Sequence, residues 1–173
     1  PDEMQQCLKN SQSNDAQLVL IELNTPGGLL STTREMTSAI IESEIPVAIY
    51  VTPAGGRAAS AGTFITYAAD IAAMAPGTNI GAATPIRMGG SSPIPGMSNG
   101  RKDQKTQKQE ESAAKKKSIA DTAAFIRGIA ELRGRNAEWA QRAVTEAKSI
   151  TADEALEKGV IDYLAGSRGA LLK

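Results

Sequence analysis

Buried strand-like runs that alternate with helical segments constrain the fold of this chain more than any other feature. The first, "AQLVLIELN" at 16–24, is apolar and rich in Val, Ile and Leu, as expected of a buried strand. The turn "TPGG" at 25–28 follows, and then "LLSTTREMTSAIIESE", whose apolar residues recur with helical spacing. A second run, "VAIYV" at 47–51, precedes a glycine-bearing loop and a helix expected at 60–70. The alternation predicts an α/β fold with a mostly parallel sheet flanked by helices.

The remaining ordered segments extend this pattern. A weak helical pattern opens the chain, and a short strand followed by a broken loop is expected within 71–86. Another helix is predicted to begin at Ser118, because "SIAD" (118–121) fits a capping box, and to end at Gly134. Two shorter helices at about 136–147 and 151–158 and a strand at 160–164 complete the chain.

The amino-acid composition changes at residues 87–115. They are rich in Gly, Pro and Ser at first and then almost wholly polar and charged. No apolar face can be drawn on them, so the sequence predicts a long mobile loop within one domain that covers 1–173.

Composition excludes several classes of function. Basic and acidic residues balance at 19 each and aromatic residues make up 3%, which argues against nucleic-acid binding. The chain has one cysteine and no histidine, so a zinc site would have almost no ligands to use. Because it opens at Pro1 without a methionine or a signal peptide, we expect it to be a soluble fragment of a longer polypeptide.

A candidate nucleophile lies in "GGRAASAGTF" at 55–64, where Ser60 stands among small residues. This loop and "TPGG" both leave the carboxyl ends of predicted strands, so they are expected to face one cleft. Acyl transfer needs a nucleophile and backbone N–H groups aimed at the developing oxyanion, and the amides of Gly28 and Ala61 are candidates for the second role. The alternative is that Ser60 only caps a helix and that the glycines only form turns.

Without histidine, a serine–histidine–acid triad is impossible in this chain, which leaves lysine as the expected proton acceptor. The informative cluster is Lys115, Lys116 and Lys117, at the start of the predicted helix. Helical phase favours Lys115 or Lys116, whereas the capping box places Lys117 just outside the helix, beside its positive end. A solvated run of charge is the third interpretation, and the residues alone leave these alternatives open.

Three long segments resemble the protease domain of the NfeD (nodulation formation efficiency D) membrane-bound serine proteases. They are "IELNTPGGLL", "GRAASAGTFITYAADIAAMAPGTNIGAATPI" and "IAELRGRNAEWAQRAVTEAKSITADEALEKGVID", within 16–165. That family belongs to the Clp protease/crotonase superfamily and is related to signal peptide peptidase A. The resemblance implies a ββα-spiral fold, Ser60 as nucleophile and an oxyanion hole at Gly28 and Ala61. It implies Lys117 as base, 17 residues before the glycine of "GRNA".

The resemblance also implies what the domain acts on and where. It implies a Ser-Lys endopeptidase without metal or cofactor that cleaves apolar segments of membrane-associated proteins such as stomatin-like partners. It further implies a homodimer and a membrane-associated parent with an extracytoplasmic protease domain. Two features depart from the family: the strand expected before the opening helix is absent, and Ala120 stands where relatives often carry asparagine.

Two other functions remain as alternatives on the same fold. One is a crotonase-like acyl-CoA enzyme, which uses similar oxyanion turns but needs no serine at position 60. The other is a non-catalytic assembly domain that binds apolar tails, because one scaffold can host many chemistries.

Overall fold

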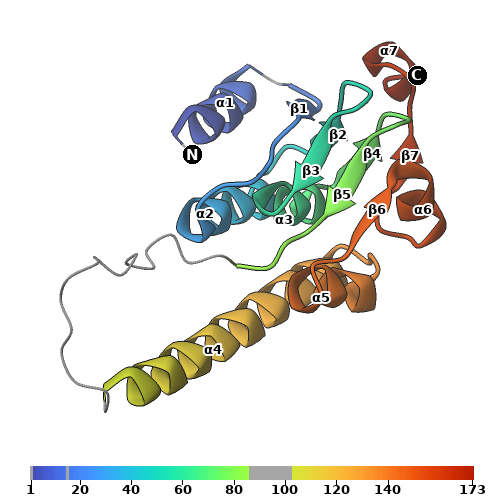
Figure 1. Cartoon of the computed structure of the whole chain (residues 1–173). Helices are drawn as coiled ribbons and strands as arrows, with labels where there is room; N and C mark the ends of the chain where they lie inside the picture. Colours follow the sequence, from blue (N-terminus) through green and yellow to red (C-terminus); the bar gives the residue numbers. More distant parts are fainter. Residues whose placement is uncertain (1, 15, 86–102) are drawn as a thin grey trace, which may run out of the picture.

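The computed structural model describes residues 2–14, 16–85 and 103–173, and Figure 1 shows the arrangement of its elements. In chain order these are α1 (Asp2–Ser13), β1 (Val19–Leu23), α2 (Leu30–Ile41), β2 (Val47–Val51), β3 (Arg57–Ala59), α3 (Ala61–Ala68), β4 (Ile71–Met74), β5 (Asn79–Gly81), α4 (Asp103–Leu132), α5 (Ala137–Thr145), β6 (Ser149–Thr151), α6 (Ala152–Glu157), β7 (Tyr163–Leu164) and α7 (Arg168–Leu171).

The main sheet has the order β1-β2-β4-β7, and all its neighbouring strands pair in parallel. Every residue of β2 is buried, because helices cover both of its faces. Val47, Ile49 and Val51 share a core with α2, α3 and α4, whereas Tyr50 packs on the opposite face, where Leu171 of α7 contacts the same cluster. The α/β fold with a mostly parallel sheet flanked by helices is therefore confirmed.

A second sheet, of order β3-β5-β6, was not predicted. Its strands have three residues each, too short for an alternating pattern to be recognised in the sequence. β3 and β5 pair in parallel, and a bridge between Thr25 and Ala58 connects the "TPGG" turn to β3. This sheet therefore brings together the two glycine-bearing turns that the sequence singled out.

The prediction of a loop over 87–115 is wrong for its second half, since α4 begins at Asp103 and runs for 30 residues. Residues 86–102 lie outside the part of the chain that the structure describes. Lys, Gln, Glu and Ala are strong helix formers, so the polar stretch continues the helix without an apolar face of its own. The start predicted at Ser118 is wrong for the same reason. Within the described ranges, no helix combines the length and the apolar character that a membrane span requires.

The "GRN" segment at 134–136 connects α4 to α5, and its buried Arg135 also contacts α3. Gly134 follows α4 with φ +65, and the Asn136 side chain caps α5. The buried guanidinium of Arg135 donates to carbonyl groups at the end of α3 and pairs with the carboxylate of Asp162. Burial raises the pKa of Tyr67, whose hydroxyl donates to the Asn136 carbonyl oxygen. This junction fixes the C-terminal half of α4 against α3 and the sheet.

Candidate active site

A pocket of about 190 Å³ lies where the N-terminal turns of α2 and α3 meet α4. Its lining residues are Gly28, Leu29, Leu30, Thr33, Ser60, Ala61, Phe64, Ala83, Pro85 and Thr122. Three of the four site residues predicted from the sequence, namely Ser60, Gly28 and Ala61, therefore line one pocket.

Ser60 occupies the N-cap position of α3 with an unusual backbone conformation, φ 51 and ψ −112. Its side chain makes no capping hydrogen bond, and its backbone N–H donates to the Gly81 carbonyl oxygen at 3.0 Å. A positive φ at a residue other than glycine costs about 1–3 kcal/mol and persists only where the surroundings impose it. The interpretation of Ser60 as a simple cap is therefore wrong, since its hydroxyl does not cap the helix.

Backbone pairing between the two turns imposes this conformation. The Thr25 N–H donates to the Arg57 carbonyl oxygen, and the Ala59 N–H donates to the Thr25 carbonyl oxygen. A Cβ placed on Gly27 would lie 2.8 Å from the Cβ of Ser60 and 3.2 Å from its Oγ. The "PGG" turn thus passes directly over Ser60, at a distance that only glycine permits.

The next residues of the two turns also lie close together. A Cβ on Gly28 would lie 3.7 Å from the Cβ of Ala61. Within the described residues, neither the Gly28 N–H nor the Ala61 N–H donates a hydrogen bond. Ala61 is also the first residue of α3, where the helix dipole is positive. Two free amides beside a serine oxygen are the arrangement that stabilises an oxyanion.

The lysine cluster is not part of this pocket. Lys115, Lys116 and Lys117 are all exposed, and none of them lines it. The argument that Lys117 lies just outside a helix is wrong, because it stands inside α4. Its place on the helix is nevertheless informative: Asp121, one turn later, pairs with Arg34 of α2 at 2.7 Å. Lys117 is therefore on the side of α4 that faces α2, whose first turn lines the pocket.

Further contacts hold α4 against the two helices that line the pocket. The Phe125 ring stacks on Phe64 of α3 with ring centroids 5.6 Å apart, and the Arg34 guanidinium lies 4.1 Å from the Phe125 centroid. Because Phe64 itself lines the pocket, these contacts set the position of α4 relative to Ser60.

Thr122 also lines the pocket, and no sequence pattern singled it out. Thr122 is only 1% exposed, and its Oγ1 has no hydrogen-bond partner among the residues that the structure describes. A single threonine in a helix carries no motif, so only the spatial arrangement reveals it.

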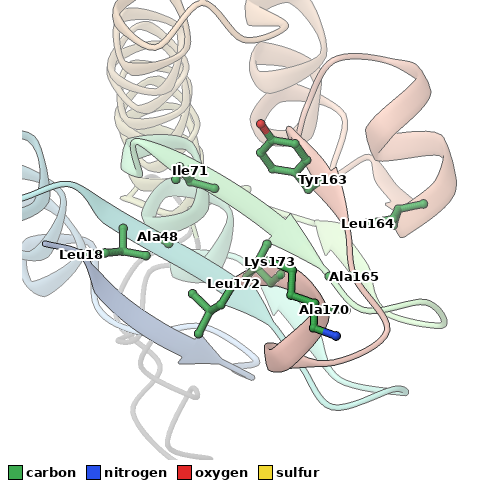
Figure 2. A pocket seen from close by; sticks show the side chains of 10 residues that line it. Leu18, Ala48, Ile71, Tyr163, Leu164, Ala165, Ala170, Leu172 and Lys173 are labelled. Atoms are coloured by element: carbon green, nitrogen blue, oxygen red, sulfur yellow. The ribbon is translucent and has the colours of Figure 1, made fainter.

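A second cavity, of about 330 Å³, lies on the opposite face of the main sheet. Figure 2 shows Leu18, Ala48 and Ile71 over the strands, with Leu172 and Lys173 nearby at the C-terminal end of the chain. It contains neither Ser60 nor the free amides, so we assign the chemistry to the first pocket.

Comparison with protein families matches residues 3–105 to "NfeD1b, N-terminal domain". The chain is 37% identical over 172 residues to the membrane-bound protease PH1510 of Pyrococcus horikoshii, which covers 99% of this chain and 35% of that relative. It is also 43% identical over 76 residues to the membrane protein NfeD1b of Bacillus subtilis, covering 44% of this chain and 17% of that protein. The chain thus spans about a third or less of the length of the curated relatives that it matches.

Solved structures agree with this assignment. A serine-to-alanine variant of the 1510-N membrane-bound stomatin-specific protease superposes with a TM-score of 0.82 at 34% identity, covering 99% of this chain and 75% of that one. A lysine-to-alanine variant of 1510-N, solved with a substrate peptide, gives 0.80 at 34% identity, covering 99% and 71%. ClpP1 from Listeria monocytogenes, at 20% identity, shows the shared fold with a TM-score of 0.68, covering 98% and 86%. This chain has a Clp protease-like α/β fold and belongs to the NfeD1b N-terminal domain family.

Proposed function

We propose that this domain is a serine endopeptidase in which Ser60 is the nucleophile and Lys117 the general base. The observation that carries the proposal is the strained Ser60, whose hydroxyl does not cap α3, beside the amides of Gly28 and Ala61, which donate no hydrogen bond among the described residues. Backbone strain concentrates at functional sites, and here it occurs at a serine that lines one pocket with Gly28 and Ala61, the two residues proposed as oxyanion donors.

The reaction follows from these positions. Ser60 Oγ attacks the peptide carbonyl carbon while its proton passes to the neutral lysine amine, and the carbonyl oxygen becomes an oxyanion. The Gly28 and Ala61 amides donate to that oxygen. The protonated lysine then gives its proton to the leaving amine, which departs and leaves an ester on Ser60. A water molecule hydrolyses this ester by the same route, with the lysine again as base.

Two observations support Lys117 as the base. It stands 17 residues before Gly134, the spacing that the family resemblance implies, and the "GRN" junction anchors the helix between them. It also shares its side of α4 with Asp121, which contacts α2 beside the pocket. Catalytic contacts are often long before substrate binds, so an exposed lysine in the free protein is compatible with this role.

The residues that line the pocket indicate the class of substrate. Leu29, Leu30 and Phe64 are the large apolar side chains that line the pocket, and Leu29 is 60% exposed. This favours an apolar peptide segment as substrate. By analogy with the stomatin-specific relative, we extend the proposal to stomatin-like membrane proteins as substrates and to a membrane-bound parent. A homodimer and an extracytoplasmic position of the protease domain stay predictions that rest on the family resemblance alone.

Peptide hydrolysis tests this function. The purified chain is incubated with an apolar peptide and with a lysine- and glutamate-rich peptide of equal length, and mass spectrometry identifies the products. We expect cleavage of the apolar peptide only, and no cleavage by the Ser60→Ala variant. Cleavage that persists in that variant, or an intact apolar peptide with the wild-type chain, would contradict the proposal.

Gly27→Ala is expected to reduce kcat/KM at least about a hundredfold, because misplacing a reacting atom by about 1 Å has an effect of that size. The new Cβ would lie 2.8 Å from the Ser60 Cβ, and φ +135 at residue 27 disfavours any side chain. Gly128→Ala is the matched control, since nothing lies within 4 Å of its added Cβ on α4. It should retain full kcat/KM. A Gly27→Ala variant as active as this control would show that the "PGG" turn does not position Ser60.

A further inference from the structure

A row of three side chains on α4 begins with the proposed base and continues into contacts with α2. Lys117, Asp121 and Phe125 follow one another at intervals of four residues, so they lie along one side of the helix. Arg34 of α2 contacts the last two members of this row. Its guanidinium pairs with the Asp121 carboxylate at 2.7 Å and lies 4.1 Å from the centroid of the Phe125 ring. The contact between α2 and α4 therefore stands one helical turn from Lys117.

Arg34 also connects this row to the pocket that contains Ser60. It directly follows Thr33, which is one of the lining residues contributed by α2. The Phe125 ring under its guanidinium stacks on Phe64, a lining residue from α3, with ring centroids 5.6 Å apart. One arginine thus joins the row on α4 to both helices that line the pocket.

The pair between Arg34 and Asp121 is the ion pair closest to Lys117 along α4, among the residues that the structure describes. Figure 1 shows the N-terminal half of α4 extending away from the sheets, so the supports nearest the lysine matter most for its position. Ile119 packs against the core, but apolar packing is non-directional. A charge-assisted hydrogen bond has a preferred geometry and can fix the rotation of a helix about its axis.

We propose that Arg34 is a positioning residue for the reaction: it sets the rotation of α4 that directs Lys117 toward Ser60. The inference rests on the proposed function, because it needs Lys117 as the base. Exposed ion pairs contribute little to stability, whereas a displacement of about 1 Å at a reacting group lowers a rate about a hundredfold. Loss of Arg34 should therefore change the reactivity of Ser60 far more than the melting temperature of the chain.

The rate of fluorophosphonate labelling at Ser60 tests this role. The serine oxygen attacks phosphorus and displaces fluoride while its proton passes to the base, so the rate depends on where the base lies. Arg34→Ala should slow labelling at least about tenfold in the otherwise wild-type chain. In the Lys117→Ala background, where labelling is slow and is followed at high probe concentration, the same substitution should have no further effect. Equal slowing in both backgrounds would show that Arg34 does not act through Lys117 and would overturn the inference.

Asp121→Ala removes the other half of the ion pair. It should also slow labelling, and its combination with Arg34→Ala should cause no further loss, because the two residues act as one unit. If Asp121→Ala instead restored labelling in the Arg34→Ala chain, Arg34 would only neutralise a carboxylate, and the positioning role would be overturned.

Arg142→Ala is the matched control, since this arginine is similarly exposed but its ion pair with Glu146 stays within α5. It should be labelled at the wild-type rate. A wild-type chain that is folded but not labelled would contradict the proposed function and the inference together. A labelled wild type with an equally reactive Arg34→Ala variant would overturn the inference alone and leave the peptidase assignment intact.

Discussion

Ser60→Ala is expected to abolish peptide hydrolysis, lowering kcat at least about a thousandfold, because the substitution removes the oxygen on which the proposed covalent intermediate forms. The fold should survive, since the Ser60 hydroxyl makes no capping bond and alanines stand at positions 58, 59 and 61. The measurement is kcat on an apolar peptide, with the melting temperature of both proteins determined in parallel.

The parallel melting curve makes this result interpretable. A variant that is inactive and equally stable has lost a catalytic group rather than its structure. Activity within a few-fold of the wild type would show that Ser60 is not the nucleophile, despite its strained backbone.

Lys117→Ala is expected to lose activity nearly as completely as Ser60→Ala, because members of one catalytic unit act together and their effects do not add. Its side chain is exposed, so the substitution should change the free energy of unfolding by no more than about 0.5 kcal/mol. The readout is kcat on the same apolar peptide.

Lys115→Ala and Lys116→Ala are the matched controls, being equally exposed neighbours in α4, and both should remain active. The opposite result has a definite structural meaning. Lys115 lies seven residues, about two helical turns, before Thr122 and so on the same side of α4 as the pocket wall. An inactive Lys115→Ala together with an active Lys117→Ala would assign the base by helical phase instead of by family spacing.

The main sheet was predictable because β1 and β2 are mainly apolar runs, each followed by a glycine-bearing turn. The N-terminal half of α4 was not, since the residues from Asp103 onward carry no apolar periodicity and gain their helix from intrinsic propensity. The strand predicted at 160–164 is shortened to Tyr163–Leu164, because only Ala73 and Met74 of β4 pair with it.

At the site, the sequence predicted Ser60, Gly28 and Ala61 correctly as neighbours, because strand ends in a parallel sheet gather at one edge. It did not predict the positive φ of Ser60, which stands next to β3 where Thr25 pairs with it, a contact between distant segments. Thr122 was missed for a similar reason, since only the packing of α4 against the other helices brings it to the pocket.

Covalent labelling tests the central assignment most directly. A fluorophosphonate reacts when an activated serine oxygen attacks phosphorus and fluoride leaves, so it reports the nucleophile independently of substrate preference. We expect one adduct per chain, located by peptide mapping on Ser60, and labelling at least about a hundredfold slower in Lys117→Ala. An adduct on another residue, or equal labelling rates in wild type and Lys117→Ala, would contradict a Ser60–Lys117 dyad.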